Sequence, residues 1–417
     1  MSTEFEDQLT QTLERAAERV PLPAIDPVAA VRLRQRRHRR HRIVISAACA
    51  VAATAAVLVG TRLAVPAPPP APRYVFSPDR IPDFATLPGP DQVWPDAVHR
   101  LPAKLPSGDR YSVVAVLGDD RYLVTRGAFE NEAGPSIFNT RTGTVTELAT
   151  PKVTEGLAMS TVLMAKEING KAVWFLEGSR NNHIGREAWM APLNGGPATR
   201  LTDLPDATAP RFSPAGNAII WEYEIPGTWK NPKGPTVFIR TISLNGGPVV
   251  NVPDTTGFEL ANVGPWITNQ RSASDLGTKT SGVLRNVATG QRLRWKAAPG
   301  IQYLRCGPTW CTGVATGNRI ALQSLDGTDP ITLPVEGSLS PTGNGRLAVG
   351  SIERPDTTAQ VVWDRTTGRA AIMLPRRVPD PLSSATQQTP VLDNEPDVLT
   401  VSATDNELVV LDLRAIG

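Results

Sequence analysis

Few residues in this sequence have the types and spacing that catalysis or metal binding requires. The 417-residue chain has three cysteines and four histidines, without an H-E-x-x-H zinc motif or a G-x-S-x-G nucleophile turn. Acidic groups such as Asp119 with Asp120, and Asp397 with its neighbours, do not follow the calcium-loop pattern and are typical of solvated turns. The sequence therefore predicts no catalytic residue, no metal and no cofactor.

Cys306 and Cys311 are the residues whose spacing points most clearly to covalent chemistry. They flank a Gly-Pro turn in LRCGPTWCTGV, so they can face each other across a hairpin at disulfide distance. A redox pair or a metal site is the alternative, but the spacing is C-x4-C and the sequence has no second Cys/His pair to complete tetrahedral zinc. The pattern favours a structural disulfide.

The elements around these residues are predicted to be β-strands. From about Val93 onward, short runs rich in Val, Ile, Leu, Tyr and Trp alternate with Gly, Asn-Gly and Asp-Gly turns. A strand–turn–strand pattern also recurs six times, every 37 to 52 residues. Its turn glycines are Gly143, Gly195, Gly246, Gly290, Gly327 and Gly368. A mean period of about 45 residues is close to that of four-stranded propeller blades.

The repeat resembles the WD40-like and TolB-like propeller repeats of bacterial envelope proteins. FSPAGNAIIW is similar to their F-S-P-D-G-x-x-I/L-A-F repeat, and VVWDRTTG is similar to the strand and turn that end a WD blade. The resemblance covers roughly residues 97–417 and implies a β-propeller.

The last repeat predicts how the ring closes. ELVVLDLR (407–414) matches the strand before a turn, but the chain stops at Gly417 without the following strand. The missing strand can come from DAVHRLPAKLP (96–106), because pairing the first strand with the last removes two exposed edges. Six turns and this shared blade predict an all-β, seven-bladed β-propeller; six blades is the alternative.

Tryptophan and histidine suggest a core and a ligand face. Trp174, Trp189, Trp221 and Trp363 lie in strand patterns and are predicted to be core residues. His183, in GSRNNHIGRE, and Trp229, in IPGTWKNPKGP, lie instead in polar loops between strands. Loops on one rim of a propeller often form its binding surface, so His183 and Trp229 are the candidate ligand-face residues.

The N-terminal region has a different character. Residues 43–65 begin with 19 uncharged residues, which in a helix would span about 30 Å, enough to cross a membrane. Seven arginines in residues 32–42 predict that the N-terminus stays in the cytoplasm. A cleaved signal peptide is the alternative, although 42 residues before the apolar run are many for one. The basic cluster indicates topology and lipid contact, not nucleic-acid binding.

The predicted organisation has four parts. Residues 1–42 form a cytoplasmic arm, with a short amphipathic helix that frays or contacts lipid, or else docks a cytoplasmic protein through residues 1–20. Residues 43–65 form the transmembrane helix. Residues 66–92 form a Pro-rich linker whose PAPPPAP run is a stiff spacer. Residues 93–417 form the extracytoplasmic propeller.

This organisation predicts a single-pass protein of the cell membrane with most of its chain outside the cytoplasm. We expect it to be a non-catalytic recognition module that binds a protein or another envelope ligand through one propeller face. The first alternative is a transmembrane regulator, because the short arm ahead of an anchor resembles those of bacterial anti-sigma proteins; it lacks the His/Cys motif of their zinc-type members. The second is an envelope hydrolase or lyase with carboxylates drawn from separate blades.

Overall fold

The structure is a computed structural model that describes residues 76–126, 134–148, 158–180, 183–204, 211–225, 236–270, 279–354, 357–373, 396–402, 404 and 406–416. The chain divides into two compact units, Met1–Ala67 and Pro68–Gly417, and every described residue belongs to the second. The predicted arm and transmembrane helix lie outside the described residues. Within the described ranges, no helix is long and apolar enough to span a membrane.

The described residues form an all-β unit of antiparallel sheets. Four sheets hold four strands each, in chain order: β2–β5 (Tyr111–Gly118, Arg121–Arg126, Ser136–Asn139, Thr144–Glu147), β6–β9 (Ala158–Ile168, Lys171–Arg180, His183–Pro192, Thr199–Asp203), β10–β13 (Phe212–Pro214, Ala218–Ile225, Thr236–Ser243, Val250–Asn251) and β14–β17 (Glu259–Leu260, Trp266–Thr268, Ser281–Asn286, Arg292–Lys296). A fifth sheet holds β18–β24 (Gln302–Cys306, Trp310–Ala315, Arg319–Ser324, Ile331–Thr342, Leu347–Arg354, Thr357–Asp364, Ala370–Met373).

The fifth sheet is two four-stranded groups that share the long strand β21. The first half of β21 pairs with β20, and the half from Gly337 onward pairs with β22. Gly337 stands at the change of partner with φ +134°, where an added Cβ would lie 2.2 Å from the carbonyl oxygen of Ser351. Only glycine fits there, so this residue lets one strand serve two sheets.

The sixth sheet joins the two ends of the unit, as the sequence predicts. β1 (Val98–Pro102) pairs antiparallel with β26 (Glu407–Asp412), which pairs in turn with β25 (Val398–Ser402). Leu101 lies opposite Leu408, and both are buried. The N-terminal strand thus supplies the partner that the last repeat lacks.

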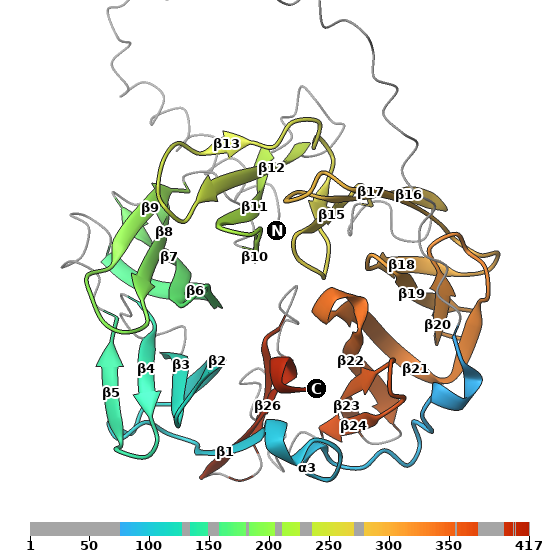
Figure 1. The fold of residues 1–417 in the computed structure, drawn as a ribbon, viewed down its shortest axis with the longest axis horizontal. Helices are drawn as coiled ribbons and strands as arrows, with labels where there is room; N and C mark the ends of the chain where they lie inside the picture. Colours follow the sequence, from blue (N-terminus) through green and yellow to red (C-terminus); the bar gives the residue numbers. More distant parts are fainter. Residues whose placement is uncertain are drawn as a thin grey trace, which may run out of the picture. The chain divides into compact units, whose positions relative to one another are not determined.

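Large apolar side chains hold neighbouring sheets together, and the contacts return to their starting point. In the described part of the chain, each core cluster lies between two successive groups of strands. The first four clusters join β2–β5 to β6–β9 (Leu123, Trp174), β6–β9 to β10–β13 (Phe175, Trp221), β10–β13 to β14–β17 (Ile239, Ile267) and β14–β17 to β18–β21 (Trp295, Leu304). The last three join β18–β21 to β21–β24 (Trp310, Trp363), β21–β24 to β25–β26 (Val362, Leu411) and β25–β26 back to β2–β4 (Val410, Val113). The sheets of this unit therefore follow one another around a ring (Figure 1), which is the arrangement of a β-propeller. The four tryptophans predicted to be core residues are all buried.

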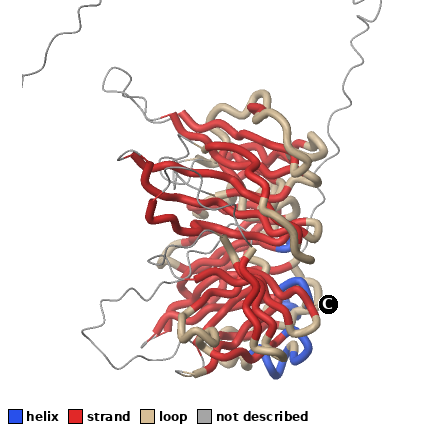
Figure 2. Tube along the Cα trace, turned by 90° about the vertical axis from the view of Figure 1, so that its left-hand side faces the viewer, coloured by secondary structure: helices blue, strands red, loops and turns tan. Residues whose placement is uncertain are grey.

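Connections between strands leave the ring at two faces (Figure 2). Because the strands alternate in direction, turns between first and second strands share a face with turns between third and fourth strands. We call this the turn face. The six glycines of the repeat all lie in third-to-fourth-strand turns and all have positive φ, from +69° at Gly143 to +97° at Gly195. Glycine adopts this conformation without steric cost, which explains its recurrence.

The segment before β1 packs along the sheet of β18–β24. It contains η1 (Pro78–Arg80), α3 (Pro90–Val93) and η2 (Pro95–Ala97). The ring of Phe76 meets Trp310 edge-on at 6.0 Å between centroids, and Phe84 meets Trp363 edge-on at 6.2 Å. Trp363 Nε1 also donates to the carbonyl of Arg80 at 3.1 Å. These contacts fix residues 76–97 to the sheets.

Candidate functional site

A cavity of about 590 Å³ opens on the turn face. The end of β2 and the start of β3 form one wall, and the β6–β7 and β8–β9 turns form another. The C-terminal η4 (Leu413–Ala415) closes the cavity. Its lining residues are Val116, Leu117, Arg121, Glu167, Asn169, Gly170, Lys171, Pro192, Leu193, Asn194 and Arg414. Two neighbouring sheets and a segment remote from both in sequence therefore build one site.

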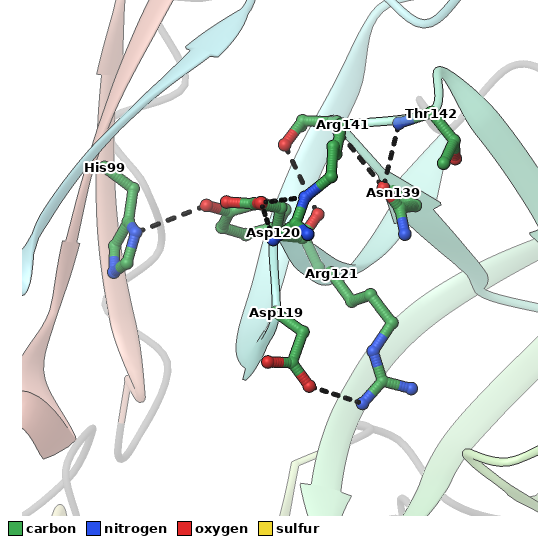
Figure 3. A network of polar contacts seen from close by, with 9 residues as sticks. His99, Asp119, Asp120, Arg121, Asn139, Arg141 and Thr142 are labelled. Atoms are coloured by element: carbon green, nitrogen blue, oxygen red, sulfur yellow. Dashed lines mark hydrogen bonds and ion pairs between the residues drawn. The ribbon is translucent and has the colours of Figure 1, made fainter.

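A tight turn positions Arg121 at the cavity. Asp119 and Asp120 are the two central residues of the β2–β3 hairpin, and both have positive φ, +53° and +57°. Asp120 accepts two hydrogen bonds from the Arg141 guanidinium, at 2.7 and 2.9 Å (Figure 3). Arg121 points away from that pair, and its carboxylate partner Asp119, 4.0 Å distant, has a side chain that is 89% exposed. A pair this long, with so exposed an acid, neutralises little of the Arg121 charge.

Backbone and side-chain contacts also fix the loop that carries Arg141. Asn139 Oδ1 accepts from the backbone N–H groups of Arg141 and Thr142, both at 3.0 Å. Next to this loop, Tyr122 Oη and His99 Nδ1 lie 3.2 Å apart and link β3 to β1 (Figure 3). Burial raises the pKa of Tyr122, so its hydroxyl stays protonated near neutral pH. This network holds the turn rigidly beside the cavity.

The β6–β7 turn carries the second part of the wall. Asn169 and Gly170 both have positive φ, and the backbone N–H of Gly170 donates to Glu167 Oε1 at 2.8 Å. The Lys171 ammonium donates to the carbonyl of Leu244 at 3.4 Å, which is a long contact with a neutral group. Glu167 therefore has a hydrogen-bond partner within the turn, whereas neither of these contacts pairs the Lys171 ammonium with a carboxylate.

Arg414 fixes the C-terminal segment across both sheets. Its Nη1 donates to Glu167 Oε2 at 2.8 Å, and its Nη2 donates to the carbonyl of Val116 at 2.5 Å. Asp412 Oδ1 accepts from the Arg414 backbone N–H at 3.0 Å and lies 3.7 Å from Nε. Arg414 thus lies between two carboxylates, those of Glu167 and Asp412, and the further cationic side chain at the cavity is Arg121.

Asp397, an acid that the sequence predicts to lie in a solvated turn, is half-buried in the structure. Asp397 comes directly before β25, and its carbonyl accepts from the backbone N–H of Leu413 at 2.9 Å. Burial raises the pKa of Asp397, and the cations Lys166 and Arg414 counteract part of that rise. The spacing of acidic residues in the sequence could not predict this environment, because the two cations come from other elements, Lys166 from β6 and Arg414 from η4.

The predicted cysteine pair is present. Cys306 and Cys311 lie opposite each other on β18 and β19, with their sulfur atoms 1.97 Å apart and their Cα atoms 4.0 Å apart. Cys311 is completely buried. The hairpin geometry expected from the sequence is therefore confirmed, and the disulfide closes a turn on the turn face.

Of the two predicted ligand-face residues, Trp229 lies outside the described residues. His183 is the first residue of β8 and does not line the cavity. It follows a connection between second and third strands, at the face opposite the turn face. No motif or periodicity in the sequence points to Arg121, Lys171 or Arg414, because each is an ordinary cation beside a turn. Among the described residues, no three Cys, His, Asp or Glu side chains are grouped to hold a metal.

No protein-family model matches the sequence, and no curated protein matches it. Solved structures show weak likenesses at low identity. TolB from Acinetobacter baumannii is 14% identical over 67% of this chain and 64% of its own length, with a TM-score of 0.35. An oligogalacturonate lyase from Vibrio parahaemolyticus is 10% identical over 76% of this chain and 97% of its own, with a TM-score of 0.44. YCF48 bound to a D1 peptide is 10% identical over 80% of this chain and 100% of its own length, with a TM-score of 0.40. The propeller arrangement rests on this chain's own strand pairing.

Proposed function

We propose that this protein is a single-pass membrane protein whose extracytoplasmic unit is a seven-bladed β-propeller that acts as a non-catalytic recognition module. Seven blades are supported by counting β21 in two sheets and the closing sheet of β1, β26 and β25 as one blade. The uncharged run in residues 43–65 and the preceding arginines support the topology. A disulfide at Cys306–Cys311 suits an oxidising compartment.

The observation that carries recognition is the cavity on the turn face. Its volume of about 590 Å³ lies within the range typical of small-molecule sites. The walls are preorganised, because Glu167 and Arg414 fix the turns and the C-terminal segment before any ligand arrives. Preorganised walls reduce the ordering cost of binding. This arrangement holds a ligand without requiring a nucleophile or a general base.

Equilibrium dialysis tests recognition against catalysis. The full chain in lipid nanodiscs would be dialysed against the small-molecule fraction of its own cell envelope, and both sides analysed by mass spectrometry. We expect one or more compounds to accumulate unchanged on the protein side. Conversion of a compound into a new product would support the hydrolase or lyase alternative. Equal concentrations of every compound on both sides would contradict small-molecule recognition.

Protease accessibility tests the topology. Protease added to intact cells, with the outer barrier made permeable, is expected to cut the chain beyond residue 75 and to spare residues 1–42. Protection of the propeller under these conditions would contradict the proposed membrane orientation.

A further inference from the structure

The cavity on the turn face has an unbalanced charge. Of its charged lining residues, Arg414 and Glu167 pair with each other at 2.8 Å. Among the described residues, the carboxylate next to Arg121 is Asp119, which is 4.0 Å away and exposed. The Lys171 ammonium is directed to the carbonyl of Leu244 in the sheet of β10–β13, so Arg121 is the cation that raises the positive potential at this opening.

The rest of the lining is mixed in a way that suits an organic ligand. Val116, Leu117, Pro192 and Leu193 present apolar atoms, while Asn169 and Asn194 present amides. A guanidinium group binds an oxyanion through two parallel hydrogen bonds. An inorganic oxyanion would use only the guanidinium of Arg121 and leave the apolar wall in contact with water, so the lining favours an oxyanion attached to an apolar body.

We propose that this cavity binds a small organic carboxylate, with Arg121 as the anchor for the carboxylate and with Leu117 and Leu193 as the wall for the apolar part. This inference rests on the proposed recognition function and names its ligand class. Asp119 competes with the ligand for Arg121, because it is the carboxylate that approaches Arg121 in the unliganded protein.

Matched probes test the charge. N-acetyl-leucyl-leucine as the free acid would be titrated into the full chain in nanodiscs by calorimetry, beside the same compound as its C-terminal amide and beside inorganic phosphate. We expect the acid to bind about tenfold more tightly than the amide, as one charge-assisted contact provides. We also expect the acid to bind more tightly than phosphate, and its affinity to fall with added salt.

Three variants test the residues. Arg121→Gln is expected to weaken binding of the acid about tenfold and to leave the amide unchanged. Asp119→Asn is expected to strengthen binding of the acid, and asparagine is tolerated at the positive φ of this position. Arg292→Gln is the control, because Arg292 is exposed on β17, in another sheet, and does not line the cavity. Circular dichroism would verify that all three fold.

The outcomes separate the two proposals. Equal binding of acid and amide, phosphate binding more tightly than the acid, or no binding of the acid would each overturn the carboxylate assignment. So would an Arg121→Gln variant that binds the acid like the wild type. If dialysis nevertheless retains other envelope compounds unchanged, the recognition function stands and only the ligand class is wrong.

Discussion

Single buried ion pairs tie the ends of strands to their turns, and Asp364 is the clearest example. Its side chain is completely buried at the end of β23 and accepts from Arg346 Nη2 at 2.6 Å. It also accepts from the hydroxyl and backbone N–H of Thr366, at 2.6 and 2.9 Å. Although burial acts in the opposite direction, these contacts lower the pKa of Asp364 to about 2.

The lowered pKa predicts a pH-dependent stability. The unfolded-state pKa of aspartate is about 3.9, so the stabilisation by Asp364 is fully present above that value and is lost as pH falls toward about 2. Asp364→Asn should lower the unfolding free energy by about 1–2 kcal/mol at neutral pH, allowing for solvent at Arg346. Denaturant titrations from pH 6 to pH 2.5 should show the difference from wild type shrinking with acid. The exposed Asp91→Asn is the control and should change stability by less than about 0.5 kcal/mol.

At the scale of the element, the glycines of the hairpin turns are of two kinds. Some have free space where a Cβ would lie, and others pack against a neighbouring sheet. Gly143 has φ +69° with no atom within 4 Å of a built Cβ. Gly327 has φ +80°, and a Cβ there would lie 2.9 Å from the carbonyl oxygen of Lys296 in the preceding sheet. Gly143 is required only by the backbone conformation of its turn, whereas Gly327 also lies in a contact between two sheets.

This difference predicts unequal effects of alanine. Gly143→Ala should cost about 1–2 kcal/mol, from the positive φ alone. Gly327→Ala should cost at least about 1 kcal/mol more, because the backbone of the neighbouring sheet must move. Urea midpoints of the two variants would show the order, and equal midpoints would mean that the Gly327 contact carries no energy.

Local signals in the sequence predicted the hairpins well. Each repeat glycine marks a third-to-fourth-strand turn, since few residues other than glycine adopt positive φ there. The Cys-Gly-Pro turn similarly predicted the disulfide. The packing of Phe76 on Trp310 and of Phe84 on Trp363 could not be predicted, because more than two hundred residues separate the partners and no periodicity links them. The cavity was missed for the same reason, since Arg414 meets Glu167 only after the ring closes.

At the scale of the whole molecule, one sheet determines whether the ring is closed. β1 and β26 pair over five residues, from Val98 with Leu411 to Pro102 with Glu407. Arg100 adds an exposed ion pair with Glu407 at 2.9 Å. The apolar cluster around Leu101 and Val410 continues into the sheet of β2–β5. Opening this sheet would expose core on both sides.

A covalent link across the closing sheet should therefore stabilise the ring. The double substitution Arg100→Cys and Val409→Cys, at two directly paired positions, would close a loop of several hundred residues and stabilise by about 6 kcal/mol in the chain-entropy model. A disulfide at Ser112 and Thr125, paired within one hairpin, would close a short loop and give about 3 kcal/mol. Unfolding midpoints with and without reductant would compare the two. A larger gain from the hairpin disulfide would indicate that the ring does not open during unfolding.

The pairing of β1 with β26 also bears on when the propeller can complete itself during synthesis. The ribosome synthesises β1 on the order of 300 residues before β26. The first blades therefore have an unpaired strand edge while the rest of the chain emerges. An unpaired edge of this kind can form strand pairs with other chains. A nascent chain stalled before β26 should therefore be a substrate for chaperones, and emergence of β26 from the ribosome should be the step that frees it.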